Sequence, residues 1–248
     1  MRACALLALM FFSLCRAQAS ESLLVMTTPW PPFRIADGQG ALYGLDIDVL
    51  DELSRRTGLR FELQQAPWAR GLTALQHGRA DLMIGLARTP ERERYIHYLP
   101  MPYYTCAPRF YAAPALAADL RGYEDLRSLK IGYVLQSAYF AQFDNDRSLS
   151  KVGVTSERQL LHMLVRGRID VLVGTDCQVD YALLAPEFAG RIVKAAYRPP
   201  MRTDLYIGFS RLRLAHAEQL AEALEAMLED GWIAGMAQRY QVVNSPLQ

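Results

Sequence analysis

The chain lacks a hydrophobic run long enough to span a membrane, and it lacks the motifs of metal and cofactor sites. Its early apolar run, Ala3 to Cys15, has 13 residues, whereas a spanning helix needs about 20. The four histidines are scattered without metal-ligand spacing, and no P-loop, nucleophile elbow or convincing dinucleotide fingerprint occurs. The sequence therefore predicts no metal and no cofactor, and nothing in it requires an enzyme.

Residues 1–19 have the features of a cleavable signal peptide. Arg2 supplies the charged start, the apolar run follows, and the segment from Ala17 to Ala19 has the A-x-A pattern of a cleavage site. We expect cleavage after Ala19 and export of the mature chain to the periplasm.

Charge and cysteine content give little indication of a partner. The formal net charge is +1 and falls to about −1 once Arg2 and Arg16 are removed, so neither nucleic acid nor an anionic membrane is expected to bind. The mature chain keeps Cys106 and Cys177. An oxidising compartment permits a disulfide between them, and two buried free thiols fit the sequence equally well.

A helix, stop and strand motif occurs twice, 89 residues apart. Leucines three residues apart share a helix face, the following glycine favours a left-handed stop, and the apolar run after the aspartate predicts a buried strand. Two such units predict two similar α/β lobes, with a ligand at the carboxyl ends of the strands. The matched positions are Leu72, Leu75, Gly78, Arg79, Asp81 and Gly85, which recur as Leu161, Leu164, Gly167, Arg168, Asp170 and Gly174.

Other segments alternate between strand and helix patterns. Ser156 and Gln159 resemble a capping box at the start of a helix, and the two acidic residues Asp46 and Asp48 are interpreted as structural groups that the dipole favours at a helix N-terminus. No low-complexity linker is present, which predicts two short crossings between joined lobes. Strands are expected over residues 23–26, 59–63, 82–84, 130–134, 152–154 and 205–209, and helices over 46–57, 67–77 and 156–166 and in a C-terminal segment interrupted at Gly231.

A series of short motifs resembles the family 3 bacterial extracellular solute-binding proteins, over nearly all of residues 20–245. The resemblance implies an α/β, type II periplasmic-binding fold, in which two lobes are joined by two hinge strands around a ligand cleft. It divides the chain into lobe 1, residues 20–105 and 203–248, and lobe 2, residues 106–202. The motifs are Pro31–Phe33, Gly44–Val49, Thr89–Arg92, Pro102–Tyr104, Leu129–Val134, the second repeat, and Glu229–Gly231 with Tyr240.

The same resemblance implies a function. It predicts a monomeric periplasmic protein that captures a small polar ligand, an amino acid or related carboxylate, and delivers it to an ABC permease of the inner membrane. Two alternatives use the same fold. One is an enzyme of the cyclohexadienyl dehydratase type, with Asp176 or Asp180 as its acid, and the other is a sensory receptor for a membrane kinase.

By this resemblance, four residues form the site for a ligand carboxylate. Arg92 ends the T-x-E-R motif and would hold the carboxylate with its planar fork. Gly85 allows close approach of the ligand to the backbone. Ala87 replaces a hydroxyl residue that many amino-acid binders have, and Ser137 would complete the anion site, although Gln136 stands where a glycine is common.

Five further residues are candidates for the rest of the ligand. Trp30 would cover it, and Trp68 would form a second wall unless it is a core residue. Arg70 would be a weak second cation facing either the cleft or solvent. The family places an acid for the α-amino group where this chain has Thr175, and the next residue, Asp176, takes that role if the chain has an insertion there.

Overall fold

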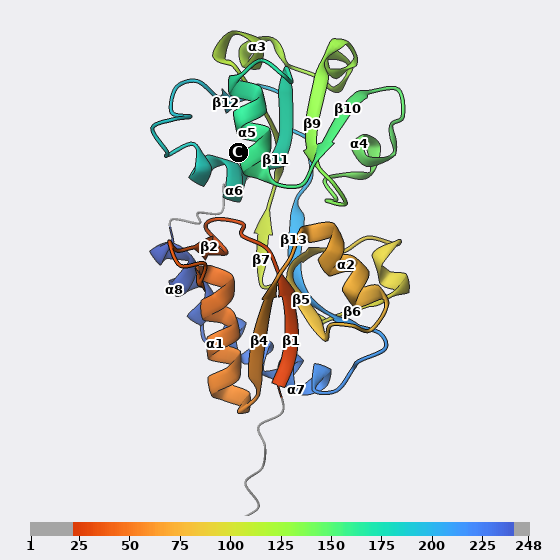
Figure 1. Cartoon of the computed structure of the whole chain (residues 1–248), viewed down its shortest axis with the longest axis vertical. Coiled ribbons are helices and arrows are strands. Elements are labelled where there is room, and N and C mark those ends of the chain that lie inside the picture. Colours follow the sequence, from red (N-terminus) through yellow and green to blue (C-terminus); the bar gives the residue numbers. More distant parts are fainter. Residues whose placement is uncertain (1–21, 241–248) are drawn as a thin grey trace, which may run out of the picture.

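The computed structural model describes residues 22–240 as two α/β lobes, one at each end of the long axis (Figure 1). The predicted signal peptide and its cleavage site lie outside the described residues. Each lobe is built around one β-sheet flanked by helices, as the repeated motif predicts. Among the described helices, none is long and apolar enough to cross a membrane.

The sheet of the first lobe contains β1 and its two parallel neighbours. β1 pairs with β4 and β5 in parallel, and β13 then runs antiparallel to β5. The strand order is β4-β1-β5-β13-β6, with β7 also pairing with β13. The strands are β1 (Ser22–Thr27), β4 (Arg60–Gln65), β5 (Leu82–Ala87), β6 (Ile96–Tyr98), β7 (Tyr104–Cys106) and β13 (Thr203–Ser210), beside a small hairpin of β2 (Ile35–Ala36) and β3 (Leu42–Tyr43).

The second lobe repeats this arrangement. β9 lies between two parallel partners, β10 and β11, and β8 is antiparallel to β11, in the order β10-β9-β11-β8-β12. The two sheets thus share a parallel core followed by an antiparallel strand. The strands are β8 (Pro108–Ala112), β9 (Lys130–Val134), β10 (Ser150–Val154), β11 (Val171–Thr175) and β12 (Val193–Lys194).

Helices lie against both sheets. In the first lobe, α1 and α7 pack together, and α7 contacts α8 beyond the left-handed Gly231 at the predicted interruption. These are α1 (Leu45–Thr57), α2 (Trp68–Gln76), α7 (Ala217–Glu229) and α8 (Trp232–Arg239), with a 3₁₀ turn, η1 (Arg92–Arg94). The second lobe has α3 (Pro114–Asp119), α4 (Ala141–Asn145), α5 (Glu157–Val165), α6 (Asp176–Ala182) and the 3₁₀ turn η2 (Tyr123–Ser128).

The repeated motif forms α2 and β5 in one lobe and α5 and β11 in the other. Gly78 and Gly167 both have a φ of 64°, which is the left-handed stop that the spacing predicts. The two aspartates make equivalent hydrogen bonds. Asp81 Oδ2 accepts from the amide of Leu24 at 2.7 Å, and Asp170 Oδ2 accepts from the amide of Lys130 at 2.7 Å. Each aspartate therefore joins the start of one parallel strand, β5 or β11, to the neighbouring parallel strand, β1 or β9.

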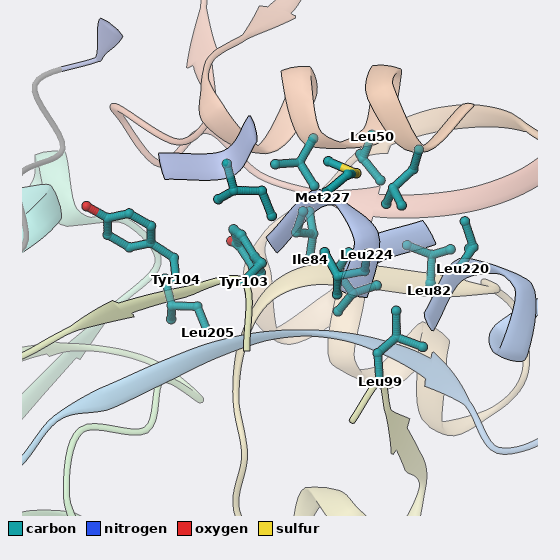
Figure 2. Packing of buried hydrophobic residues seen from close by; sticks show 14 of the residues in the cluster. Leu50, Leu82, Ile84, Leu99, Tyr103, Tyr104, Leu205, Leu220, Leu224 and Met227 are labelled. Atoms are coloured by element: carbon teal, nitrogen blue, oxygen red, sulfur yellow. The ribbon is translucent and has the colours of Figure 1, made fainter. Parts of the chain in front are cut away.

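Apolar side chains from α1, α7 and the sheet form the core of the first lobe (Figure 2). Leu53 and Val49 from α1 are fully buried, as are Leu220 and Met227 from α7. At about 25 cal/mol per Å² of buried apolar surface, such clusters supply most of the free energy that holds each lobe. The second lobe has its own clusters on either side of its sheet, so each lobe has a separate hydrophobic core.

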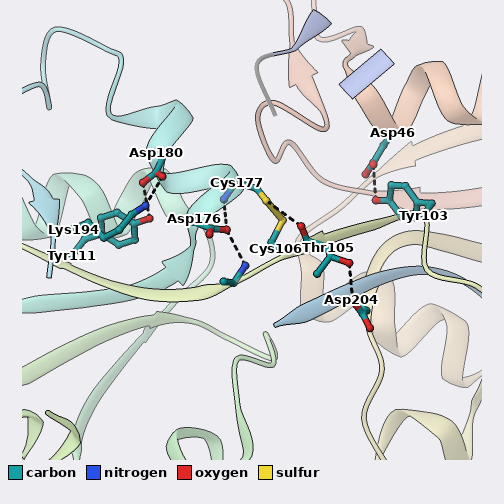
Figure 3. Close-up of a disulfide and its surroundings, with 11 residues drawn as sticks. Asp46, Tyr103, Thr105, Cys106, Tyr111, Asp176, Cys177, Asp180, Lys194 and Asp204 are labelled. Carbon is teal, nitrogen blue, oxygen red and sulfur yellow. Dashed lines mark hydrogen bonds and ion pairs between the residues drawn. A yellow bond between two sulfur atoms is a disulfide. The ribbon is translucent and has the colours of Figure 1, made fainter. Parts of the chain in front are cut away.

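The two crossings between the lobes lie side by side. β7 and β13 pair antiparallel, with Thr203 opposite Cys106, and the hydroxyl of Thr105 donates to Asp204 Oδ1 at 2.7 Å. Cys106 is disulfide-bonded to Cys177 at the start of α6, with 5.7 Å between the two Cα atoms (Figure 3). The structure therefore joins the two thiols, which the sequence left open, and ties a hinge strand to the second lobe.

We expect removal of this disulfide to destabilise the protein by about 4 kcal/mol. The bond closes a sequence separation of 71 residues, and loop entropy in the unfolded chain gives that magnitude. Urea unfolding of a Cys106→Ala/Cys177→Ala variant checks it, with dithiothreitol added to both proteins as the control. A reductant should lower the stability of the wild type alone, and a change below about 1 kcal/mol in the variant would contradict the prediction.

Candidate ligand-binding site

A cavity of about 80 Å³ lies between the lobes, at the carboxyl ends of the parallel strands. Residues after β1 and from β5 line it from the first lobe, and the last residues of β9 and β11 line it from the second, with the loops that follow β9 and β10. The structure brings seven of the nine candidate residues to this cavity and leaves Arg70 and Asp176 away from it. The seven are Trp30, Trp68, Gly85, Ala87, Arg92, Ser137 and Thr175.

Arg92 is 5 % exposed and bridges the two lobes. Its Nη1 donates to the carbonyl of Ala87 at 2.8 Å, and its Nη2 donates to the carbonyl of Gln136 across the cleft at 2.6 Å. Burial lowers the pKa of the guanidinium, which nevertheless stays cationic because the ordinary value for arginine is above 12. These two bonds use two of its five N–H groups, so a buried cation with spare donors faces the cavity.

Gly85 adjoins a second buried arginine that the sequence analysis did not include. A Cβ built on Gly85 would lie 2.9 Å from Arg34 Nη1, and the φ of +82° at Gly85 is strained for other residues. Arg34 itself lines the cavity. The missing side chain at Gly85 therefore makes room for the Arg34 guanidinium.

The charge of Arg34 is matched within the protein. The guanidinium forms a buried ion pair with Asp46 and donates to the carbonyls of Thr28 and Ile84 at 2.8 and 3.1 Å. Tyr103 Oη donates to Asp46 Oδ1 at 2.6 Å. Burial raises the pKa of Asp46, while Arg34 and Tyr103 oppose that rise. Asp46 lies in the first turn of α1 as predicted, and it also holds Arg34 in place.

Each cleft tryptophan packs against an arginine of the protein. The Trp30 ring stacks on Phe33 at 4.5 Å between ring centres and has the Arg34 guanidinium carbon 5.2 Å from its centre. The Trp68 ring lies 5.9 Å from the corresponding atom of Arg92. Both indoles thus position cations of the site, and Trp68, at the start of α2, is a cleft residue as well as a neighbour of the core.

The loop after β9 has the backbone geometry that a glycine would favour. Gln136 has a φ of 63°, so the replacement of the usual glycine keeps the left-handed conformation and presents the Gln136 carbonyl to Arg92. The hydroxyl of Tyr139 accepts from the Val134 amide at 3.1 Å and interacts with the Ser137 side chain. Ser137 is therefore held at the edge of the cavity.

Asp176 is committed to the backbone and not to the cavity. Its Oδ1 accepts from the amides of Ala107 and Cys177, both at 2.8 Å (Figure 3). Asp180, the other candidate acid, accepts from Tyr111 Oη at 2.8 Å and from Lys194 Nζ at 2.6 Å. Neither carboxylate lines the cavity.

The same region contains the one grouping of metal-ligand side chains found among residues 22–240. It consists of Cys106, Asp176 and Cys177. The two sulfurs are joined to each other, so no thiolate is available there for a metal.

Glu157 is the one carboxylate among the described residues that line the cavity. It occupies the first position of α5, directly after Ser156, whose side chain accepts from the Gln159 amide as predicted. Burial raises the pKa of Glu157 to about 7, and interactions with Arg34 and Trp30 of the other lobe oppose that rise. The carboxyl ends of β9, β10 and β11 share one edge of the sheet, where ligands bind in folds of this kind. The position of Glu157 directly after the β10 loop could therefore have identified it as a site residue from the sequence.

Three polar atoms at the cavity have no hydrogen-bond partner within the described residues. They are Trp68 Nε1, Thr175 Oγ1 and Thr203 Oγ1. Buried polar groups rarely remain unpaired in proteins, so these atoms indicate where a ligand can make hydrogen bonds. Together with Arg92 and Glu157 they place a small number of polar groups in a cleft between two hinged lobes, which is the architecture of a solute-binding protein.

The chain belongs to the bacterial extracellular solute-binding proteins, family 3, whose pattern matches residues 23–243. Among curated proteins it is similar to a probable amino-acid ABC transporter-binding protein of Haemophilus influenzae. The two chains are 24 % identical over 223 residues, which are 87 % of this chain and 83 % of the relative. Another relative has the name L-cystine-binding protein TcyA, from Bacillus subtilis, so both names describe binding proteins.

Solved structures have the same fold at low sequence identity. A histidine kinase sensor domain with similarity to periplasmic binding proteins has a TM-score of 0.80 at 19 % identity, covering 91 % of this chain and 98 % of that one. The substrate-binding protein AbpA from Streptococcus pneumoniae, bound to L-arginine, has a TM-score of 0.78 at 19 % identity, and the match covers 89 % of this chain and 95 % of that one. The ancestral amino acid-binding protein AncCDT-1, a precursor of cyclohexadienyl dehydratase, has a TM-score of 0.75 at 21 % identity, and the match covers 88 % of this chain and 94 % of that one. These likenesses confirm the type II fold.

Proposed function

We propose that this protein is a periplasmic receptor that captures an amino acid or related small carboxylate and delivers it, as a monomer, to an ABC permease. Arg92 is the observation that carries the proposal. It is a buried cation at the junction of the lobes, its two described hydrogen bonds go to carbonyl groups, and a planar guanidinium pairs well with a carboxylate. The names of the curated relatives support the ligand class.

Closure of the lobes is the proposed mechanism. A ligand that contacts both lobes shifts the equilibrium toward the closed state by its difference in affinity for the two states. Arg92 would hold the carboxylate from the first lobe, and Ser137 and Thr175 would contact the ligand from the second. The bond from Arg92 to Gln136 already links the lobes at this point.

A thermal-shift screen of the mature protein tests the proposal. The compounds are the L-amino acids, polyamines, opines and dicarboxylates, each added alone. Ligand at about 100 times its dissociation constant adds roughly 2.7 kcal/mol, which should raise the unfolding midpoint by several degrees. Stabilisation by one class of amino acid supports a receptor, whereas no response from any compound would contradict the proposal.

Glu157 supports one second candidate, a dehydratase on the same fold. A carboxyl group whose pKa is about 7 can be protonated in a closed cleft and act as a general acid. In prephenate it would protonate the leaving hydroxyl, which departs as water while a carboxylate leaves as CO₂. Incubation with prephenate and arogenate tests this. Formation of the aromatic product, lost in Glu157→Gln, would favour the enzyme, and no turnover would dismiss it.

A further inference from the structure

Glu157 has a carboxylate in the cavity that no ion pair within residues 22–240 neutralises. It extends from the second lobe toward Trp30 and Arg34 of the first lobe. The positive charge of Arg34 is already matched by Asp46 in a fully buried pair. Glu157 therefore faces a neutral pair and not a free cation.

Arg92 has the opposite imbalance. It donates to two carbonyl oxygens, and among residues 22–240 no carboxylate lies close enough to form an ion pair with it, although Asp144 and Glu91 act on it electrostatically. The cavity thus contains one unmatched cation and one unmatched acid, each with its own neighbours. Burying an unmatched charge is costly, and a molecule that carries both signs would neutralise both groups.

The position that family members use for the ligand's amino group is neutral in this protein. Thr175 occupies it, and the Asp176 carboxylate is occupied by the amides of Ala107 and Cys177. An acid for a ligand cation must therefore come from elsewhere in the cavity, and Glu157 is the carboxylate that lines it.

We propose that Glu157 receives a positively charged group of the ligand, so that this receptor selects carboxylates that also carry an ammonium or guanidinium over plain anions. This inference rests on the proposed receptor function and narrows its ligand class. Specificity then arises at the start of α5, on the loop after β10, and not at the end of β11.

The assignment predicts a pH dependence of ligand binding. The groups that face Glu157 are Arg34 and Trp30 from the first lobe, with Asp46 behind Arg34, and Tyr139 from its own lobe. Because the pKa of Glu157 is about 7, the empty receptor is protonated there at low pH and must lose that proton to bind a cation. Affinity should therefore rise about tenfold per pH unit below 7 and level off above it.

Calorimetry on the mature protein tests this, with the strongest-binding L-amino acid other than histidine as the first probe and succinate and lactate as anions without a cation. The wild type should bind the amino acid about thirtyfold more weakly at pH 5.5 than at pH 8.5. Glu157→Gln should lose at least that factor at pH 8.5 and show a flat profile. Glu187→Gln is the matched control, because Glu187 is exposed in the same lobe and has no place in the cavity.

The stability of Glu157→Gln provides a readout without ligand. At low pH the Glu157 carboxyl is protonated and neutral in the folded and unfolded states, as a glutamine is, so the two proteins should have similar stability. Because folding raises the pKa of Glu157 from 4.5 to about 7, the wild type loses stability as pH rises through 7, and a glutamine, which does not titrate, avoids that loss. The variant should therefore unfold about 5 °C above the wild type at pH 8.5 and close to it at pH 4.5. A variant that instead melts below the wild type at both values would show a structural role and overturn the assignment.

The remaining outcomes separate the inference from the function on which it rests. Unchanged amino-acid affinity in Glu157→Gln, a flat wild-type profile, or equal affinity for succinate would overturn the role of Glu157 and leave a receptor. Failure of the wild type to bind any amino acid or anion would overturn the receptor itself.

Discussion

Arg92→Ala should weaken the binding of a carboxylate ligand by at least about 100-fold. Charge-assisted bonds between a guanidinium and a carboxylate are worth about 1.5–3 kcal/mol, and more when the partner is left buried and unpaired. The substitution also removes the bond to the Gln136 carbonyl across the cleft, so the closed state loses a contact between the lobes. Both effects act in the same direction on affinity.

Calorimetry with the amino acid found in the screen checks this, and Arg70→Ala is the matched control. Arg70 is exposed on α2 and does not line the cavity, so its removal changes net charge equally without touching the site. Arg92→Lys should recover part of the affinity at most, because one ammonium cannot hold Ala87, Gln136 and a ligand in the planar arrangement of a guanidinium. Wild-type affinity in Arg92→Ala would remove the central assignment of this site.

The sequence predicted the architecture well because the architecture depends on local patterns. Leucines at helical spacing, a left-handed glycine and an aspartate before an apolar run specify α2 and β5 in the first lobe. The same pattern specifies α5 and β11 in the second lobe. The same aspartates, Asp81 and Asp170, make equivalent hydrogen bonds that join β5 to β1 in one lobe and β11 to β9 in the other. The boundaries of the two lobes near residues 105 and 203 remain a proposal.

The site was predicted less completely because it depends on contacts between distant segments. Arg92, Gly85 and Ser137 came from motif matches, and the structure brings them together. Asp176 was chosen by its place after β11, but a short motif cannot show that the amides of Ala107 and Cys177 occupy its carboxylate. Glu157 was missed because its loop was interpreted as a helix cap alone.

Arg34 and Asp46 show the same limit. A charged residue in a proline-rich loop is ordinarily exposed, and only the fold places the Arg34 side chain at 2 % exposure beside a fully buried Asp46. The helix-dipole interpretation of Asp46 was correct about its location in the first turn of α1. It could not anticipate the ion pair, because the partner lies 12 residues earlier in the chain.

Asp46→Asn should therefore destabilise the protein by about 3–5 kcal/mol, the usual cost of removing one partner from a buried ion pair. Asp48→Asn is the matched control, since Asp48 lies in the same first turn but is partly exposed and accepts from Tyr240 Oη. If the helix dipole were the reason for both acids, the two variants would lose similar amounts, about 0.3–1 kcal/mol each. Urea unfolding at pH 7 distinguishes these expectations.

A double variant shows whether the cost arises from the unpaired charge. Arg34→Met/Asp46→Leu replaces both charges with apolar groups, and such replacements are often neutral or stabilising in buried pairs. It should unfold at higher urea than Asp46→Asn, although it removes more polar groups. Its ligand affinity should still fall, because Arg34 lies beside Gly85 and opposite Glu157. Recovery of stability without recovery of binding would show that this buried pair is kept to shape the cleft and not to hold the lobe together.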